Sequence, residues 1–202
     1  MKHFISGKLL FLMVYLFVSI TLQANLAPDQ PIALRLPNSY IIKPGESVTI
    51  PVVKAYAVWQ QIPELSATNP NLTGELTATL FWQDSKGLIK NLSLQGSDAS
   101  ASILIESDES QEGNAVVAVK LGGKIRWSWH IWVTAYDPDM QNKKINTGGE
   151  ELASMTCNLG TVSTDVTQTG LLYQFGRKDP FPGTDSLSLT GNYNYAGRKI
   201  YD

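Results

Sequence analysis

Alternating apolar and polar positions dominate the middle of the chain. The clearest case is a pair of such runs, residues 115–121 and 124–134, which are separated only by Gly122 and Gly123. A two-residue Gly-Gly loop between alternating runs is a strong β-hairpin signal. We therefore predict an antiparallel hairpin centred on these two glycines.

Regular alternation through this hairpin predicts which residues share a face. The predicted pairs are Lys120 with Ile125, Ala118 with Trp127, Val116 with Trp129, and Asn114 with Ile131. The expected core face carries Ile125, Trp127, Trp129, Ile131, Val133, Val116 and Ala118. The expected second face carries Lys124, Arg126, Ser128, His130 and Trp132, opposite Val117, Val119 and Leu121. This second face is mixed in character, which is typical of a surface that another layer half covers. Trp132 is its candidate for an exposed or interfacial position.

Shorter runs with turn residues between them extend the strand pattern. We expect strands at residues 40–42, 47–53, 76–82, 88–94 and 102–106, and a loop at 62–71. No helical periodicity stands out among them. About seven short strands at this spacing predict a mainly β protein, with an immunoglobulin-like antiparallel β-sandwich over residues 32–136.

The pattern changes at Asp137. Residues 137–150 are polar and contain Pro138 and two glycines, so we expect a linker. Residues 151–202 hold too few apolar side chains to close a core of their own. We expect a short, loop-rich C-terminal module that either packs on the sandwich or is the start of a truncated domain.

The N-terminus has the order of a secretory signal. Lys2 and Lys8 precede an apolar run over residues 9–22, and Ala24 follows. This predicts a signal peptide at residues 1–24, with an uncleaved membrane anchor as the alternative. We expect an exported protein of the periplasm or bacterial cell surface, without a transmembrane span once the signal is cleaved.

Charge and cysteine content narrow the classes of function. The formal net charge is −2 and no basic stripe is present, so nothing favours nucleic-acid binding. Cys157 is the one cysteine, so an exported chain forms no intramolecular disulfide and depends on its hydrophobic core.

Catalytic and metal chemistry have little support in the sequence. His130 is the one histidine after the signal, and no motif surrounds Cys157. Asp137 and Asp139 resemble the start of a calcium loop, but the glycine and further acids of such a loop do not follow. We predict neither an enzyme nor a cofactor site.

Three segments carry a family resemblance. They are W-S-W-H-I-W-V-T at residues 127–134, N-L-G at 158–160 and G-L-L-Y-Q-F-G-R-K-D-P-F at 170–181. They resemble fimbrillin-like exported surface proteins of gut bacteria whose C-terminal module is similar to the Fibrobacter succinogenes major paralogous domain. Residues 39–45 and 112–119 are similar to the sandwich of that family. The chain departs from the pattern at residues 155–158 and at Phe175, where the family usually has tryptophan.

The resemblance implies a non-enzymatic exported cell-surface protein, associated with fimbriae or adhesins, that contacts proteins or glycans. The alternative is a carbohydrate-binding or periplasmic accessory module for glycan uptake. Family members usually continue well beyond the R-K-D-P-F block, so a truncated or degenerate member is an expectation here. The candidate contact residues are Trp132, Tyr173, Phe175, Arg177 and Asp179.

Overall fold

The computed structural model describes residues 31–68, 72–161, 163, 165, 170–175 and 178–182. The chain divides into two units, residues 1–35 and 36–202. In the first unit the described part is a single short helix, α1 (Ile32–Arg35). The predicted signal peptide lies outside the described residues. None of the helices in the described ranges is long and apolar enough to cross a membrane.

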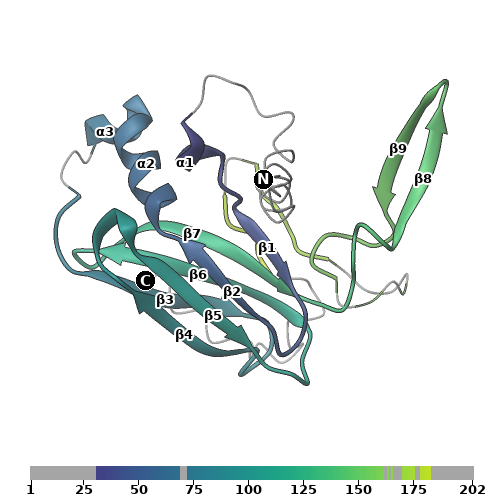
Figure 1. The fold of residues 1–202 in the computed structure, drawn as a ribbon, viewed down its shortest axis with the longest axis horizontal. Coiled ribbons are helices and arrows are strands. Elements are labelled where there is room, and N and C mark those ends of the chain that lie inside the picture. Colours follow the sequence, from purple (N-terminus) through teal and green to yellow (C-terminus); the bar gives the residue numbers. More distant parts are fainter. Residues whose placement is uncertain are drawn as a thin grey trace, which may run out of the picture. The chain divides into compact units, whose positions relative to one another are not determined.

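The second unit is built on two β-sheets that lie face to face (Figure 1). The four-stranded sheet has the order β1 (Ser39–Ile42), β7 (Lys124–Val133), β6 (Gly113–Leu121), β3 (Leu76–Gln83). The three-stranded sheet has the order β2 (Ser47–Pro51), β5 (Ser102–Ser107), β4 (Ile89–Gln95). All paired strands are antiparallel except β1 and β7, which are parallel. The predicted mainly β sandwich is confirmed. Its immunoglobulin-like assignment stays a prediction.

The main core fills the space between the two sheets. Its side chains come from alternate positions of the strands, as expected when one face of each sheet is buried. They include Ile42, Ile50, Ile103, Ile105, Val117, Val119, Trp129, Ile131 and Val133, with Trp127 half-buried at the margin. Trp129 is therefore a core residue, as its sequence position predicted.

The central hairpin forms at Gly122 and Gly123, which both have positive φ angles, 60° and 78°. This is the backbone of a tight two-residue hairpin turn, in which glycine carries no steric penalty. The first predicted pair, Lys120 with Ile125, is present, but the next is Val119 with Trp127. The other three predicted pairs are wrong, because a bulge at Arg126 shifts the register by one residue.

This shift exchanges the two faces of β6. Val117 and Val119 point into the main core, whereas Val116 and Ala118 belong to a second apolar cluster on the outer face. The residues of β7 from Trp127 onward lie on the faces predicted for them. Arg126, expected on the outer face, instead lines a hollow with Val119.

Two helices lie in the region where the sequence predicted a strand to residue 53 and a loop at residues 62–71. Helix α2 (Val53–Gln61) follows β2 directly, and α3 (Pro63–Thr68) follows α2. A one-turn helix, η1 (Asp98–Ser100), precedes β5. Two successive valines favoured strand in the sequence pattern, but the backbone leaves the sheet after Pro51. Burial of Ala55, Ala57 and Val58 then stabilises α2.

The segment expected as a linker contains a strand. β8 (Asn142–Thr147) pairs in antiparallel register with β9 (Glu150–Met155) across the turn at Gly148 and Gly149. This hairpin projects away from the two sheets (Figure 1), and nearly all of its side chains are exposed. Its polar sequence gave no strand alternation to detect, because it has no buried face.

Candidate functional site

The outer face of the four-stranded sheet is covered by the C-terminal part of the chain. We call residues 158–161, 170–175 and 178–182 the covering segment. Leu171 of this segment joins Phe81, Trp82, Val116 and Ala118 in a buried apolar cluster. The sequence left open whether these residues dock on the sandwich, and the described part of them does.

Asn114 is the polar centre beneath the covering segment. Its side-chain Nδ2 donates to Asp84 Oδ2 at 2.9 Å and to the Gly160 carbonyl at 2.7 Å. Its backbone N–H donates to Asp84 Oδ1 at 2.8 Å. These bonds fix the orientation of the amide, so Asn114 Oδ1 must act as an acceptor. Asn114 thereby joins the end of β3 to the covering segment.

His130 lies beside Asn114 and is 4% exposed. Its Nε2 is 3.0 Å from Asn114 Oδ1, which is an acceptor, so Nε2 is the nitrogen that carries a proton. Nδ1 is buried without a hydrogen-bond partner among the described residues. Burial lowers the pKa of His130 from 6.5 to about 4, against the opposing effect of the Asp179 charge. This is the environment of a structural histidine rather than a general base poised near neutral pH.

A second polar group joins Ser128 of β7 to Lys178 and Asp179 of the covering segment. Ser128 Oγ donates to the Asp179 carboxylate, at 2.7 and 2.9 Å from its two oxygens. Lys178 Nζ lies 2.6 Å from Ser128 Oγ and forms an ion pair with Asp179. Burial lowers the pKa of Lys178, and its pairing with Asp179 opposes that shift.

This Ser-Lys-Asp group resembles a nucleophile with a base beside it, but its geometry is structural. Ser128 is almost completely buried, so no substrate carbonyl can approach its Oγ. The Ser128 proton is donated to a carboxylate, and the lysine ammonium is paired rather than free to accept a proton. Asp179, predicted as a contact residue, serves here to anchor the covering segment.

The exposed half of the β7 edge is closed by two side chains. β1 pairs only with residues 130–133 of β7. Nearer the start of the strand, the Arg126 carbonyl accepts a bond from Trp59 Nε1 at 2.6 Å, and the Ser128 carbonyl accepts one from Lys178 Nζ at 2.8 Å. These bonds occupy backbone acceptors that an added strand would use. Neither Trp59 nor Lys178 was identified from the sequence, since both act on residues distant in the chain.

Trp132 is in the interior, contrary to its prediction as a contact residue. It is 1% exposed, and its Nε1 donates to the Thr161 carbonyl at 3.1 Å. The alternation of β7 placed it correctly on the outer face of the sheet. That face is buried at this point because the covering segment lies over it.

Tyr173 and Phe175 are the sequence-predicted contact residues that the structure leaves exposed. Tyr173 is 55% exposed and the Phe175 side chain is fully exposed. The loop that carries them is closed by two backbone bonds between Leu172 and Phe181, of 3.0 and 2.8 Å. Arg177 lies outside the described residues. We call Tyr173 and Phe175 the aromatic pair.

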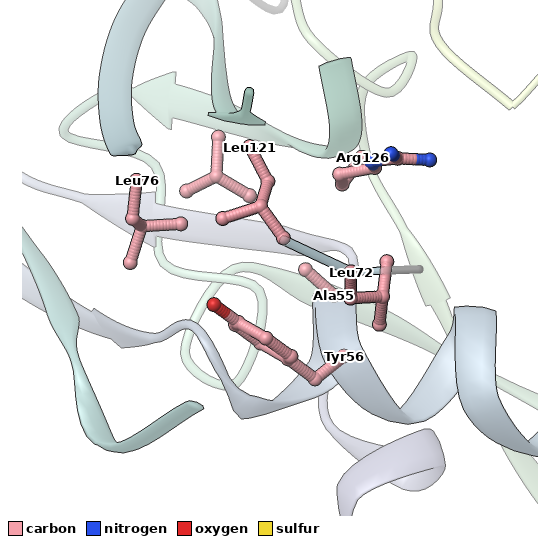
Figure 2. A pocket seen from close by; sticks show the side chains of 7 residues that line it. Ala55, Tyr56, Leu72, Leu76, Leu121 and Arg126 are labelled. Carbon is pink, nitrogen blue, oxygen red and sulfur yellow. The ribbon is translucent and has the colours of Figure 1, made fainter. Parts of the chain in front are cut away.

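Described residues also line two hollows away from the aromatic pair. The first is beneath α2 and is shown in Figure 2, where Tyr56, Leu76 and Leu121 point into it. Its volume is about 10 Å³, which is about the room of one water, and its lining is mostly apolar. It is a packing defect rather than a ligand site.

The second hollow is a polar groove of about 260 Å³ at the far end of β7. Its lining residues are Glu112, Thr134, Ala135, Tyr136, Gln141, Cys157, Thr161 and Ser163. Cys157 is a free thiol whose pKa is raised by burial, while its side-chain hydrogen bond with Tyr136 acts in the opposite direction. This groove could not be anticipated from the sequence, because its lining comes from several separate segments.

No group of three or more His, Cys, Asp or Glu side chains in the described ranges is arranged to hold a metal ion. The Asp137-Pro138-Asp139 sequence has a local explanation. Asp137 Oδ1 accepts the backbone N–H of Asp139 at 3.0 Å and of Met140 at 3.2 Å. This is an Asx-type turn that leads toward β8.

Comparison with known proteins gives no relative for this chain. No family model, no curated protein and no solved structure matches it.

Proposed function

We propose that this protein is an exported, non-enzymatic cell-surface protein, of the fimbria- or adhesin-associated kind, that contacts a protein or glycan through the aromatic pair. The observation that carries the proposal is the exposure of Tyr173 and Phe175 on a loop whose base is anchored. The anchor is the group formed by Ser128, Lys178 and Asp179.

Large exposed aromatic side chains on an anchored loop favour a recognition role. An exposed phenylalanine adds apolar surface in water and contributes nothing to the core. Aromatic rings supply much of the contact energy at protein interfaces, and ring faces also stack on sugars. A loop fixed at its base loses less conformational entropy when it binds.

The non-enzymatic part of the proposal is supported by the surroundings of the side chains that could act as a nucleophile or a base. His130 and Ser128 are buried under the covering segment and hydrogen-bonded within it. The raised pKa of the Cys157 thiol disfavours the thiolate that a cysteine nucleophile needs.

Binding of the full chain to an array of immobilised glycans, and to an array of secreted and surface proteins, tests the proposal. The double variant Tyr173→Ser, Phe175→Ser should lose most of the binding seen on either array. Met140→Ser is the matched control, because Met140 is another large apolar side chain, 82% exposed, at a separate turn. Equal binding by all three proteins contradicts the proposal. Binding confined to glycans favours the carbohydrate-binding accessory module over the adhesin.

A further inference from the structure

We propose that the polar groove at the end of β7 is a binding site for one neutral sugar unit, held through two adjacent hydroxyl groups. We call it the Glu112 groove. The inference deepens the proposed function by giving glycan contact a specific place, separate from the aromatic pair. It rests on two polar side chains that line one hollow of suitable size.

Glu112 supplies a fixed acceptor. Its Oε2 accepts a hydrogen bond from Thr134 Oγ1 at 2.9 Å, and that hydroxyl in turn accepts the backbone N–H of Tyr136 at 3.1 Å. The carboxylate is therefore held at one oxygen by the end of β7. The other oxygen, Oε1, has no hydrogen-bond partner among the residues that the structure describes. A carboxylate oxygen in a groove is a strong acceptor for a ligand hydroxyl.

Gln141 supplies a fixed donor. Its Oε1 accepts the backbone N–H of Asp137 at 2.8 Å, which determines the orientation of the amide. Its Nε2 then carries two N–H donors, neither of which is used within the described part of the chain. A carboxylate acceptor and an amide donor in one hollow match a pair of hydroxyl groups, each of which can donate and accept.

The charge, acidic content and volume of the groove disfavour anions, calcium and large ligands. The Glu112 charge, with no lysine or arginine in the lining, disfavours anions. A calcium ion takes six to eight oxygen ligands and usually several carboxylates, whereas Glu112 is the one acidic residue in the lining. The volume of about 260 Å³ is below that of most sites for drug-sized ligands. A single neutral sugar ring, such as the end of a glycan, fits this combination.

Cys157 offers a direct probe of occupancy. It lines the groove and is the one cysteine of the chain, so alkylation of the protein reports on this place alone. Burial raises the thiol pKa, so the reaction is best followed at mildly alkaline pH. A bound sugar should slow alkylation, because it blocks approach to the sulfur.

The experiment measures the alkylation rate of the full-length protein with a panel of neutral hexoses, N-acetylhexosamines and deoxyhexoses at millimolar concentration. At least one sugar should slow the reaction in a saturable way. Glu112→Gln keeps the Thr134 contact but removes the charge, and Gln141→Glu keeps the Asp137 contact but removes the donor. Each should weaken the protecting sugar about tenfold or more. Glu109→Gln, an exposed acid on another turn, is the control and should leave protection unchanged.

Three outcomes overturn the inference. One is a panel in which no sugar slows alkylation. Another is protection that survives both groove variants. The third is glycan-array binding that is lost in the aromatic-pair variant but unchanged in Glu112→Gln and Gln141→Glu. That last result leaves the proposed function standing while rejecting the groove, so the two failures are distinguishable.

Discussion

Trp132 lies against Tyr136, with ring centroids 5.8 Å apart and ring planes inclined by 23°. The pair joins three parts of the chain. Trp132 Nε1 donates to the Thr161 carbonyl, and Tyr136 Oη donates to the Gln141 carbonyl at 3.2 Å while accepting the backbone N–H of Thr156 at 3.1 Å. The end of β7, the base of the β8–β9 hairpin and the covering segment therefore share one aromatic junction.

Replacement of Trp132 should be as damaging as replacement of a main-core tryptophan. Trp132→Ala leaves a large cavity and removes the bond to Thr161, so we expect a loss of about 3–5 kcal/mol in the free energy of unfolding. Trp132→Phe should cost less. Denaturant melts of both variants, with Trp129→Ala as the reference, measure this. A Trp132→Ala loss far below that of Trp129→Ala would show that the outer face is not tightly covered.

Removal of the covering segment should destabilise the sandwich. Of the two sequence expectations, a truncated module that does not pack on the sandwich would leave a chain ending near Asp139 folded almost unchanged. The structure gives the opposite expectation, because that chain lacks the Gly160 and Thr161 carbonyls and leaves Asn114 and Trp132 without them. We expect a loss of about 3 kcal/mol or more. Denaturant melting of the shortened chain decides between unchanged and reduced stability. In the full chain, amide hydrogen exchange at Leu171 should be slow.

Acidification should weaken the fold through His130. The pKa of His130 in the folded protein is about 4, which is below the pKa of 6.5 of a histidine in the unfolded chain. The unfolded state therefore binds the proton first, so this contribution to stability is complete above pH 6.5. It is lost as the pH falls from 6.5 to about 4 and does not change further below that. The loss is about 3 kcal/mol.

His130→Gln is the matched variant for this measurement, since a glutamine amide can still donate to Asn114. Urea melts between pH 7 and pH 4 should give a shallower pH dependence for His130→Gln than for the native chain. Parallel slopes for the two proteins would mean that carboxylates, and not His130, dominate the acid response.

The anchor of the aromatic pair should be separable from the pair itself. Asp179→Ala leaves Ser128 and Lys178 without their shared acceptor, so we expect stability to fall by about 1–3 kcal/mol and binding to weaken. Phe175→Ser removes only an exposed ring and should weaken binding at unchanged stability. Thermal melts and binding to the same array give both quantities. A Phe175→Ser variant that melts earlier than the native protein would place that ring in the fold rather than at the surface.

Export can be tested at the N-terminus. The order of basic, apolar and small residues predicts cleavage after Ala24, so the exported protein should begin near Asn25. N-terminal sequencing of protein recovered from the periplasm or cell surface measures this. Recovery of the protein in membranes with its first 24 residues intact would favour the anchor instead.

Part of the candidate site could be anticipated from the chain alone. Tyr173 and Phe175 stood out as aromatic residues in a polar, turn-rich block, and the structure leaves both exposed. Asp179 was placed with them but pairs with Ser128, some 50 positions earlier. The Glu112 groove was not anticipated, because Glu112 and Gln141 have no shared motif and meet only through the turn after β7.

The sequence by itself determined the features that depend on local alternation and turn chemistry. These are the mainly β class, the hairpin at Gly122 and Gly123, and the burial of Trp129. Each follows from residues close together in the chain, because strand faces repeat every two residues and glycine adopts the positive φ angles of this turn without strain.

Only the tertiary structure decided which surfaces are covered. The bulge at Arg126 adds one residue to β7 and so exchanges the two faces of β6. Trp132 is buried because Thr161, far along the chain, accepts its N–H, and α2 forms where valines favoured a strand. In each case the free energy comes from contacts between distant segments, which outweigh local preferences of well under 1 kcal/mol per residue.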